Sequence, residues 1–263
     1  MIKFCPLFSS SSGNSVYIGE HGSGILIDVG RSAKQITEML IKTNIEPTSI
    51  KAIFITHEHS DHIKGLSVFA AKYNIPVYAS TGTLLTLKQK GILTGKHTDI
   101  ALNDSPVYID RLKIEAFCTS HDCTDGRGYI ITGSDGTTRI AIATDTGYLP
   151  TEILAKITGC KLVYLESNYD KNMLRNGPYS YQLQRRIDSD IGHLSNNACC
   201  DLLRALVNKG TTHFVLAHLS RENNTPEVAL EAVRGSLNNE GLVENEDFEI
   251  CVAPREDARM LIF

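Results

Sequence analysis

Residues 57–62 (HEHSDH) hold the densest group of potential metal ligands in the chain. His57, His59, Asp61 and His62 fall within six positions, although the chain has only nine histidines. The preceding segment, residues 51–55, is mostly apolar and is predicted to be a buried strand. Side chains alternate in extended backbone, so His57 and His59 project to the same side, whereas a helix that begins at Asp61 directs the other two elsewhere. One loop can therefore serve two adjacent ions, and imidazole with carboxylate suits zinc, iron or manganese.

This segment is one of several motifs that together resemble a known family. THEHSDH matches the H-x-H-x-D-H motif of the metallo-β-lactamase-fold hydrolases, and further segments match in the family's order over nearly the whole chain. These segments are SSSSGNS, LIDVG, SHD at His121, ATDTG at Asp145 and HLSRENNTPE at His218. Within the family, the chain is most similar to the YycJ (WalJ) group and more distantly similar to tRNase Z. The resemblance implies a four-layer α/β/β/α sandwich that holds two divalent metal ions, zinc or manganese.

The resemblance also implies a role for individual residues. The implied ligands are His57, His59, His121 and Asp145 for one metal, and Asp61, His62, Asp145 and His218 for the other. Asp28 matches a supporting acid that would hydrogen-bond a ligand imidazole and set its orientation. His121, Asp145 and His218 each follow a predicted strand. Asp122, next to His121, has no assigned role.

Two metal ions imply a hydrolytic mechanism, because a metal pair can activate water and polarise a phosphoryl oxygen. The resemblance implies attack by a metal-bound hydroxide that Asp61 helps to orient. His193 matches a histidine that protonates the leaving oxygen in tRNase Z-like enzymes. It precedes a predicted helix with Ser195 as a possible N-cap, where backbone N–H groups favour an anion. The alternative for His193 is a surface histidine without a catalytic role.

Other polar segments are candidates for substrate contacts. Ser220 and Arg221 follow His218 and could bind a phosphate, which an arginine can grip with two parallel hydrogen bonds. Thr225 is predicted to be the N-cap of the last long helix. Glu166 follows another predicted strand, and the sequence leaves open whether it supports the site or only forms a turn.

A basic and aromatic cluster lies within residues 170–190, a polar segment of ambiguous structure. The cluster comprises Lys171, Arg175, Tyr179, Tyr181, Arg185 and Arg186. Such a mixture could follow a phosphate backbone and stack on a base. It could equally be a solvated helix face that Asp188 and Asp190 balance.

The elements that must position these residues alternate along the chain. Strands are predicted at residues 3–8, 15–18, 24–28, 51–55, 76–79, 107–109, 112–117, 128–132, 139–143, 162–165, 213–217 and 248–252. Helices are predicted at residues 32–40, 61–73 with Ser60 as N-cap, 83–90, 197–207 and 225–237. Each half thus contains strands followed by helices, which is compatible with an α/β fold of four layers. We expect a single domain over residues 1–263.

Composition restricts the function further. The chain carries a formal net charge of −4 and a pI of about 6.1, which disfavours nucleic-acid binding through overall charge. It has seven cysteines without C-x-x-C spacing, which are interpreted as reduced buried thiols of a cytoplasmic protein. Neither a secretory signal nor an apolar run of about 20 residues is visible, so no membrane association is expected. His21, His97 and His213 are interpreted as structural.

Two functions remain in competition. The first is a phosphodiesterase acting on nucleic acid, DNA rather than RNA, and the resemblance implies a 5′ to 3′ exonuclease on duplex DNA. The second is a small-molecule hydrolase for a cyclic phosphodiester, thioester or lactone. A wide basic channel would favour the polymer, and a closed apolar pocket would favour the small substrate. A non-catalytic protein on the same fold is the third and weakest interpretation, since all implied ligand positions are filled.

Overall fold

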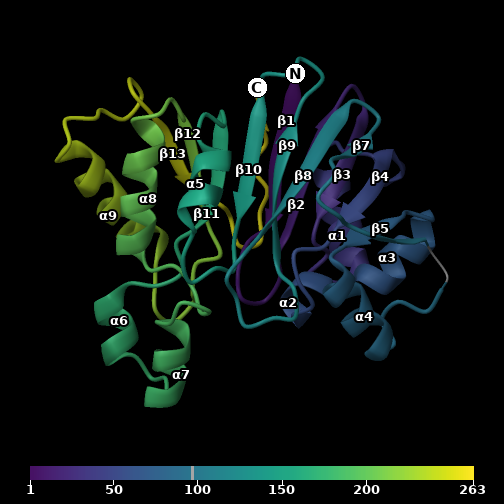
Figure 1. Cartoon of the computed structure of the whole chain (residues 1–263), viewed down its shortest axis with the longest axis horizontal. Helices are drawn as coiled ribbons and strands as arrows, with labels where there is room; N and C mark the ends of the chain where they lie inside the picture. The colour runs from purple at the N-terminus through teal and green to yellow at the C-terminus, as the bar shows by residue number, and fades with distance from the viewer. Residues whose placement is uncertain (96–97) are drawn as a thin grey trace.

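The computed structural model describes residues 1–95 and 98–263, and within them the strands form two seven-stranded sheets (Figure 1). The first sheet has the order β14 (Leu261–Ile262), β1 (Ile2–Phe8), β2 (Ser15–Glu20), β3 (Ser23–Ile27), β4 (Ile50–Phe54), β5 (Val77–Ala79) and β6 (Asp99–Ala101). The second has the order β13 (Glu249–Val252), β12 (His213–Ala217), β11 (Leu162–Glu166), β10 (Arg139–Ala143), β9 (Arg127–Thr132), β8 (Leu112–Cys118) and β7 (Val107–Ile109).

Helices cover the outer faces of both sheets. The helices are α1 (Ala33–Lys42), α2 (Ser60–Ile63), α3 (Leu66–Tyr73), α4 (Thr81–Gln89), α5 (Thr151–Ile157), α6 (Lys171–Asn176), α7 (Tyr181–Ile187), α8 (Asn196–Val207) and α9 (Pro226–Asn238), with a 3-10 turn at Pro47–Ser49. Helices α1, α3 and α4 flank the first sheet, and α5, α8 and α9 flank the second (Figure 1). The predicted α/β/β/α sandwich is confirmed.

The alternation of apolar side chains explains the four layers. Ile25 and Ile140 point into the core between the two sheets, where both are buried. Their chain neighbours Leu26 and Ala141 point the other way and pack under the helices. The central strands, such as β3, β10, β11 and β12, therefore bury both faces, which explains their nearly continuous apolar sequences. Burying one such large aliphatic side chain contributes about 1.5 to 3 kcal/mol.

The direction of the strands determines where functional loops can meet. Strands β3 to β6 run parallel to one another, and so do β10 to β13. The carboxyl ends of neighbouring parallel strands meet at one edge of a sheet, where ligand sites of such sheets lie. Helix α2, which follows β4, marks this edge at the bottom of Figure 1.

The predicted helix over residues 61–73 is wrong in one respect, since it is two helices separated at Lys64 and Gly65. The N–H of Gly65 donates to the carbonyl of Val29 at 2.9 Å, and a Cβ there would lie 2.2 Å from the Arg31 carbonyl oxygen. This close approach to the loop after β3 interrupts the helix. The predicted Ser60 N-cap is also wrong, because His59 holds the cap position and Ser60 is the first helical residue.

Several short elements were absent from the sequence prediction, among them the 3-10 turn at Pro47–Ser49 and three others. These three are α5, β6 and β14. Strand β14 exists only through pairing with β1, where Lys3 lies opposite Ile262 and Phe4 opposite Leu261. The ambiguous segment of residues 170–190 forms α6 and α7.

All seven cysteine thiols are free, as expected. Burial is confirmed for Cys5, Cys160, Cys199 and Cys200, whereas Cys118 is exposed.

In the part of the chain that the structure describes, every helix is too short or too polar to cross a membrane.

Candidate metal centre

Three residues that lie one or two positions after strands adopt left-handed backbone conformations. Asp28, Asp145 and His218 follow β3, β10 and β12 with φ values of 62°, 56° and 54°. This conformation costs a non-glycine residue about 1 to 3 kcal/mol and persists where the surrounding structure enforces it. All three are among the predicted site residues, so the strain lies at the carboxyl edge of both sheets.

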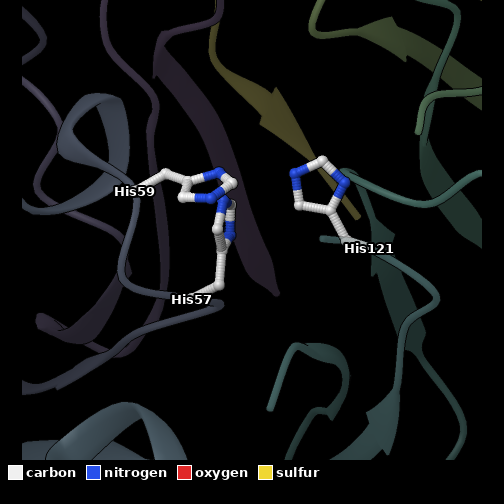
Figure 2. A group of neighbouring side chains, drawn as sticks. All are labelled: His57, His59 and His121. Atoms are coloured by element: carbon white, nitrogen blue, oxygen red, sulfur yellow. The ribbon is translucent and has the colours of Figure 1, made fainter. Parts of the chain in front are cut away.

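His57, His59 and His121 form one group of imidazoles. Figure 2 shows His57 and His59 on one loop, with His121 facing them from the opposite side. The ring centroids of His57 and His59 are 4.5 Å apart, and each lies 5.1 Å from that of His121. His57 and His121 are buried, and each of the three rings offers a nitrogen within 4.8 Å of the others.

Asp61, His62 and His218 form a second group. The Nε2 atoms of His62 and His218 lie 3.5 and 3.6 Å from Oδ2 of Asp61. Asp61 and His62 come from the same short helix α2, whereas His218 comes from the other sheet. The two sheets therefore contribute to one site.

Asp145 lies between the two groups. Its Oδ2 is 3.4 Å from Nε2 of His62, and its Oδ1 is 3.8 Å from Nε2 of His121. His57, His62 and Asp145 also form a set of potential ligands of their own. The structure thus brings together all seven predicted ligand positions, with Asp145 placed where a bridging carboxylate would stand.

The second nitrogen of four of these imidazoles has a defined acceptor. Nδ1 of His62 donates to Asp28 at 2.7 Å, and Nδ1 of His121 donates to the Gly192 carbonyl at 2.9 Å. Nδ1 of His218 is 2.8 Å from Glu166. Nδ1 of His57 is 3.0 Å from the hydroxyl of Thr56, which itself donates to Asp28. Each Nε2 is therefore left facing the cluster, as is usual for histidines that bind metals. Asp28 has the supporting position that was expected of it.

Burial and neighbouring charges divide the imidazoles into two kinds. Burial lowers the pKa of His57 and of His121, so both rings are neutral near pH 7 and offer a lone pair. Burial also opposes protonation of His62 and His218, but nearby carboxylates, Asp145 foremost, raise the pKa of both. These carboxylates supply the negative charge that a bound cation requires.

Asp61 stays ionised in this environment. Burial acts to raise its pKa, but the charges of His62 and His218 hold the pKa well below its usual range.

The chemistry of the unpaired atoms fits divalent metal ions. Nε2 of His57, Nε2 of His218 and Oδ2 of Asp145 are buried without a hydrogen-bond partner. Each buried polar atom left without a partner costs about 1 to 3 kcal/mol. Three such atoms meet in one cluster, and all are nitrogen or carboxylate oxygen, the donors that zinc and manganese accept. The residues present fit such ions.

His193 lies beside this cluster. Its Nδ1 is 2.7 Å from Oε1 of Glu166, and its ring centroid lies 4.9 Å from that of His121. Its side chain is 17% exposed and lines the cleft, and its catalytic role stays a prediction.

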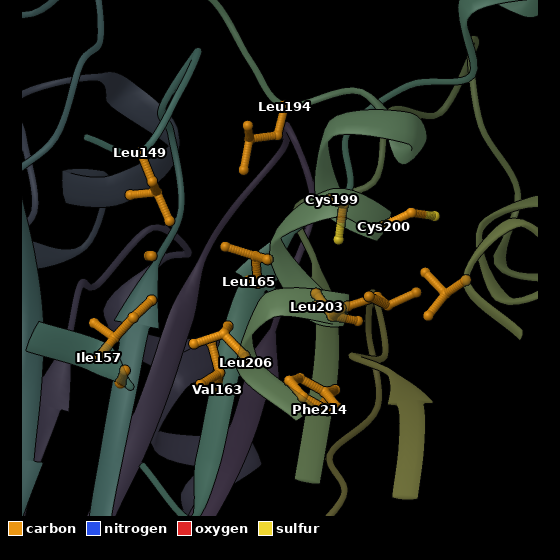
Figure 3. Packing of buried hydrophobic residues seen from close by; sticks show 14 of the residues in the cluster. Leu149, Ile157, Val163, Leu165, Leu194, Cys199, Cys200, Leu203, Leu206 and Phe214 are labelled. Carbon is orange, nitrogen blue, oxygen red and sulfur yellow. The ribbon is translucent and has the colours of Figure 1, made fainter. Parts of the chain in front are cut away.

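The backbone around His193 is held by the second sheet. The N–H of Leu194 donates to Glu166, and the Leu194 side chain lies in the apolar cluster with Cys199 and Leu203 of α8 (Figure 3). Ser195 is the N-cap of α8, as predicted. The idea of an anion at this helix start is not supported, because the N–H of Asn196 donates to the carbonyl of Tyr169 and Ser195 accepts from Ala198.

Ser220 and Arg221 occupy different positions. Ser220 is buried in the wall of the cleft, and its hydroxyl accepts from the N–H of Asn223 at 3.1 Å. The Arg221 guanidinium lies at the rim, 2.9 Å from the Ser12 hydroxyl and 3.5 Å from Glu256. Thr225 caps α9, as predicted.

Asp122 and three further residues acquire clear roles only in the structure. Oδ2 of Asp122 accepts from Arg186 of α7, and its Oδ1 is 3.4 Å from Nε2 of His121. Asn14 donates to Asp61 and contacts His62, while Glu58 accepts from Thr124 in the loop after His121. The open question about Glu166 is resolved, because it is fully buried and contacts both His193 and His218.

The cluster forms the floor of an open, polar cleft of about 230 Å³. Histidines of the cluster line this cleft together with Tyr179, Leu183 and Arg186 of the α6–α7 region. A neighbouring hollow of about 610 Å³ shares Ser11 and Asp61 with it. These two adjoining hollows, here called the trough, are open and differ from the closed apolar pocket that would favour a small substrate.

The remaining histidines lie elsewhere. His21 is in the turn after β2, and His213 stacks edge-on against Phe263 at 4.8 Å. His97 lies outside the described residues.

Comparison with known proteins agrees with this arrangement. Residues 24–219 match the family model described as the beta-lactamase superfamily domain. Exodeoxyribonuclease YycJ of Bacillus anthracis is 35% identical to this chain over 251 residues, which cover 95% of this chain and 94% of the relative.

Two solved structures share the fold. The metallo-β-lactamase fold protein YhfI of Bacillus subtilis matches with a TM-score of 0.74 and 15% identity, over 98% of this chain and 99% of YhfI. The short form of human tRNase Z matches with a TM-score of 0.66 and 16% identity, over 99% of this chain and 98% of tRNase Z.

Proposed function

Because the chain belongs to the β-lactamase superfamily, as a hydrolase of the metallo-β-lactamase fold, we propose that it is a dinuclear metal-dependent DNA exonuclease that degrades duplex DNA from 5′ ends. The observation that carries this proposal is the cluster of unpaired imidazole and carboxylate atoms on the floor of an open trough. The name of the Bacillus anthracis relative supports DNA as the substrate. Free thiols agree with a cytoplasmic location.

The proposed metals, zinc or manganese, would be held at two adjoining positions. The ligands proposed are His57, His59, His121 and Asp145 for one ion, and Asp61, His62, Asp145 and His218 for the other. When bound, such ions supply an activated water as the nucleophile and polarise the phosphoryl oxygen.

The chain's own residues would orient the attacking water and protonate the leaving oxygen. Asp61 is ionised and lies at the boundary between the two hollows of the trough, where it can accept a hydrogen bond from the attacking water. His193 has Nδ1 held by Glu166, so Nε2 is the nitrogen that remains to give a proton to the leaving oxygen. Asp28 and Glu166 keep the ligand imidazoles in position.

Ser220 and Arg221 are proposed to contact the substrate at different depths. The Ser220 hydroxyl lines the cleft beside the cluster and would hydrogen-bond the scissile phosphate. Arg221 at the rim would bind a phosphate farther along the strand, in exchange for its contact with Glu256.

Cleavage of end-labelled duplex DNA tests the proposal. Metal-stripped protein is supplied separately with manganese and zinc, and DNA labelled at the 5′ or the 3′ end is followed on a gel beside the matching RNA. We expect stepwise loss from the 5′ end that His59→Ala abolishes and His21→Ala, a histidine outside the cluster, leaves intact. Hydrolysis of bis-p-nitrophenyl phosphate without cleavage of DNA or RNA would contradict the nuclease assignment and favour a small phosphodiester.

A further inference from the structure

Residues 170–190, here called the arm, form a helix pair at the edge of the molecule. Helices α6 and α7 extend beyond the layers of the sandwich, at the lower left of Figure 1. The arm has a small apolar core of its own, made by Leu174 and Ile187 with Tyr169. Its remaining surface is available to solvent.

The two helices of the arm are basic in an acidic protein, while Asp170, Asp188 and Asp190 at the ends of the arm reduce its net charge to +1. Residues 171–187 contain Lys171, Arg175, Arg185 and Arg186 and no acidic residue, whereas the whole chain has a net charge of −4. All four basic residues are exposed. Among the ion pairs of the described residues, only Arg186 of these four is engaged, with Asp122. Three positive charges therefore face solvent without a carboxylate partner.

Aromatic side chains accompany these charges. Tyr181 is 74% exposed and stands one helical turn before Arg185 on α7. Tyr179 lines the cleft that holds the metal cluster. Exposed tyrosines beside arginines offer a base a surface for stacking, and the charges follow the phosphates.

The arm is firmly attached on the side of the metal cluster. At its base, the Tyr169 hydroxyl donates to Asp188 at 2.5 Å. The Ser120 hydroxyl donates to the Asp190 carbonyl at 2.7 Å, and the N–H of Asp122 donates to the Ile191 carbonyl at 3.0 Å. The segments that carry His121 and His193 are thus joined to the arm, which forms one wall of the cleft.

We propose that the arm is the nucleic-acid binding element of this enzyme and holds the backbone of the strand whose end lies in the cleft. Lys171, Arg175 and Arg185 contact successive phosphates, and Tyr181 stacks on a base. This inference rests on the proposed nuclease function. It explains how an acidic chain binds a polyanion, since the basic charge is concentrated beside the site.

Binding of a fluorescent single-stranded oligonucleotide, measured by anisotropy in chelator, tests the arm separately from catalysis. The arm variant combines Lys171→Gln, Arg175→Gln and Arg185→Gln, and Arg186 is kept because it pairs with Asp122. The matched control combines Lys51→Gln, Lys72→Gln and Lys209→Gln, which remove the same charge from exposed positions outside the cleft. We expect the arm variant to bind at least about tenfold more weakly, with a slope of log affinity against log salt smaller by about 2, or roughly 0.7 per lost contact. The control should bind nearly as the unaltered protein does.

A second pair of variants tests stacking without a change in charge. Tyr181→Ala should weaken binding by about fivefold or more. Tyr108→Ala, which removes another tyrosine that is 68% exposed, should not. Hydrolysis of bis-p-nitrophenyl phosphate should stay within about twofold in every variant, because none of the altered residues lines the cleft in which this small substrate would react.

The outcomes separate the two proposals. Equal weakening by the arm and control variants, or an unchanged salt slope, would overturn the role of the arm. Binding that depends on the arm in a protein that cleaves no DNA would support the arm and overturn the exonuclease activity.

Discussion

Single hydrogen bonds set the chemistry of each imidazole in the cluster. His62, His121 and His218 each place Nδ1 against an acceptor that another part of the chain provides. The acceptor decides the tautomer and the ring orientation, and so directs Nε2 to the shared centre. Glu166 is the most connected of these acceptors, because it serves His218 and His193 together.

Glu166→Gln should therefore disturb two imidazoles at once. The amide preserves the shape but removes the negative charge, and loss of such a supporting group typically costs about 10- to 100-fold in activity or metal affinity. We expect kcat for bis-p-nitrophenyl phosphate to fall in this range. Steady-state kinetics with parallel metal analysis measures it, with Glu115→Gln, a partly exposed glutamate paired with Lys113, as the control. Equal activity of the two variants would contradict the role of Glu166.

Residue types and spacing predict some of these positions and not others. His57, His59, Asp61 and His62 stand together in the sequence, so their joint role is predictable from spacing. Glu166 is different, because its partners lie 27 and 52 residues away. The sequence shows only an acid at the end of a strand, and only the folded sheets bring it to His193 and His218.

Strand ends and turns position the site at the scale of elements. Strands β3, β10 and β12 are each followed, within two residues, by a left-handed residue of the site. The order of strands and helices was predictable, because each long apolar strand is bounded by polar loops. The break between α2 and α3 was not predictable from the sequence, since it depends on the contact of Gly65 with the distant loop at Val29.

Glu20 links β2 of the first sheet to the loop after β9 of the second sheet. This contact makes the free energy of unfolding depend on pH. Glu20 is at the end of β2, and its carboxylate accepts from the N–H and hydroxyl of Ser134, after β9, at 2.9 and 2.8 Å. Burial alone would raise the pKa of Glu20, but the hydrogen bonds from Ser134 and the charged N-terminus lower it. A carboxyl with a lower pKa in the folded chain stabilises the fold above its unfolded pKa, and this contribution is lost as pH falls through the folded value.

Glu20→Gln should consequently lower the free energy of unfolding by about 1 kcal/mol near pH 7 and much less near about pH 3. Urea unfolding at the two pH values measures the difference. Glu38→Gln removes a surface glutamate paired only with Lys34 and should have little effect at either pH. A Glu20→Gln effect of the same size at both pH values would contradict the assignment.

At the scale of the whole molecule, two sheets place their carboxyl edges around one trough. The first sheet contributes Asp28 and His57, and the second contributes Asp145 and His218. The site therefore exists only when both sheets are packed together, and metal binding should stabilise their packing. A single domain over residues 1–263 stays a prediction.

Removal of the metals should lower the melting temperature. A ligand that binds only the folded state at a thousand times its Kd contributes about 4 kcal/mol. In a chain of this size that corresponds to a loss on the order of 10 °C after chelation. Scanning calorimetry with and without chelator measures it, and the loss should be smaller in His59→Ala, which binds metal less well. An unchanged melting temperature would mean that the cluster binds no metal under those conditions.

The central claim is that the cluster is a two-metal hydrolytic centre. Its most direct test is titration of metal-stripped protein with manganese or zinc while hydrolysis of bis-p-nitrophenyl phosphate and bound metal are measured on the same samples. We expect activity to rise from near zero and to reach its plateau at about two ions per chain, since two ions act together in such centres. A plateau at one ion, or full activity without metal, would contradict it.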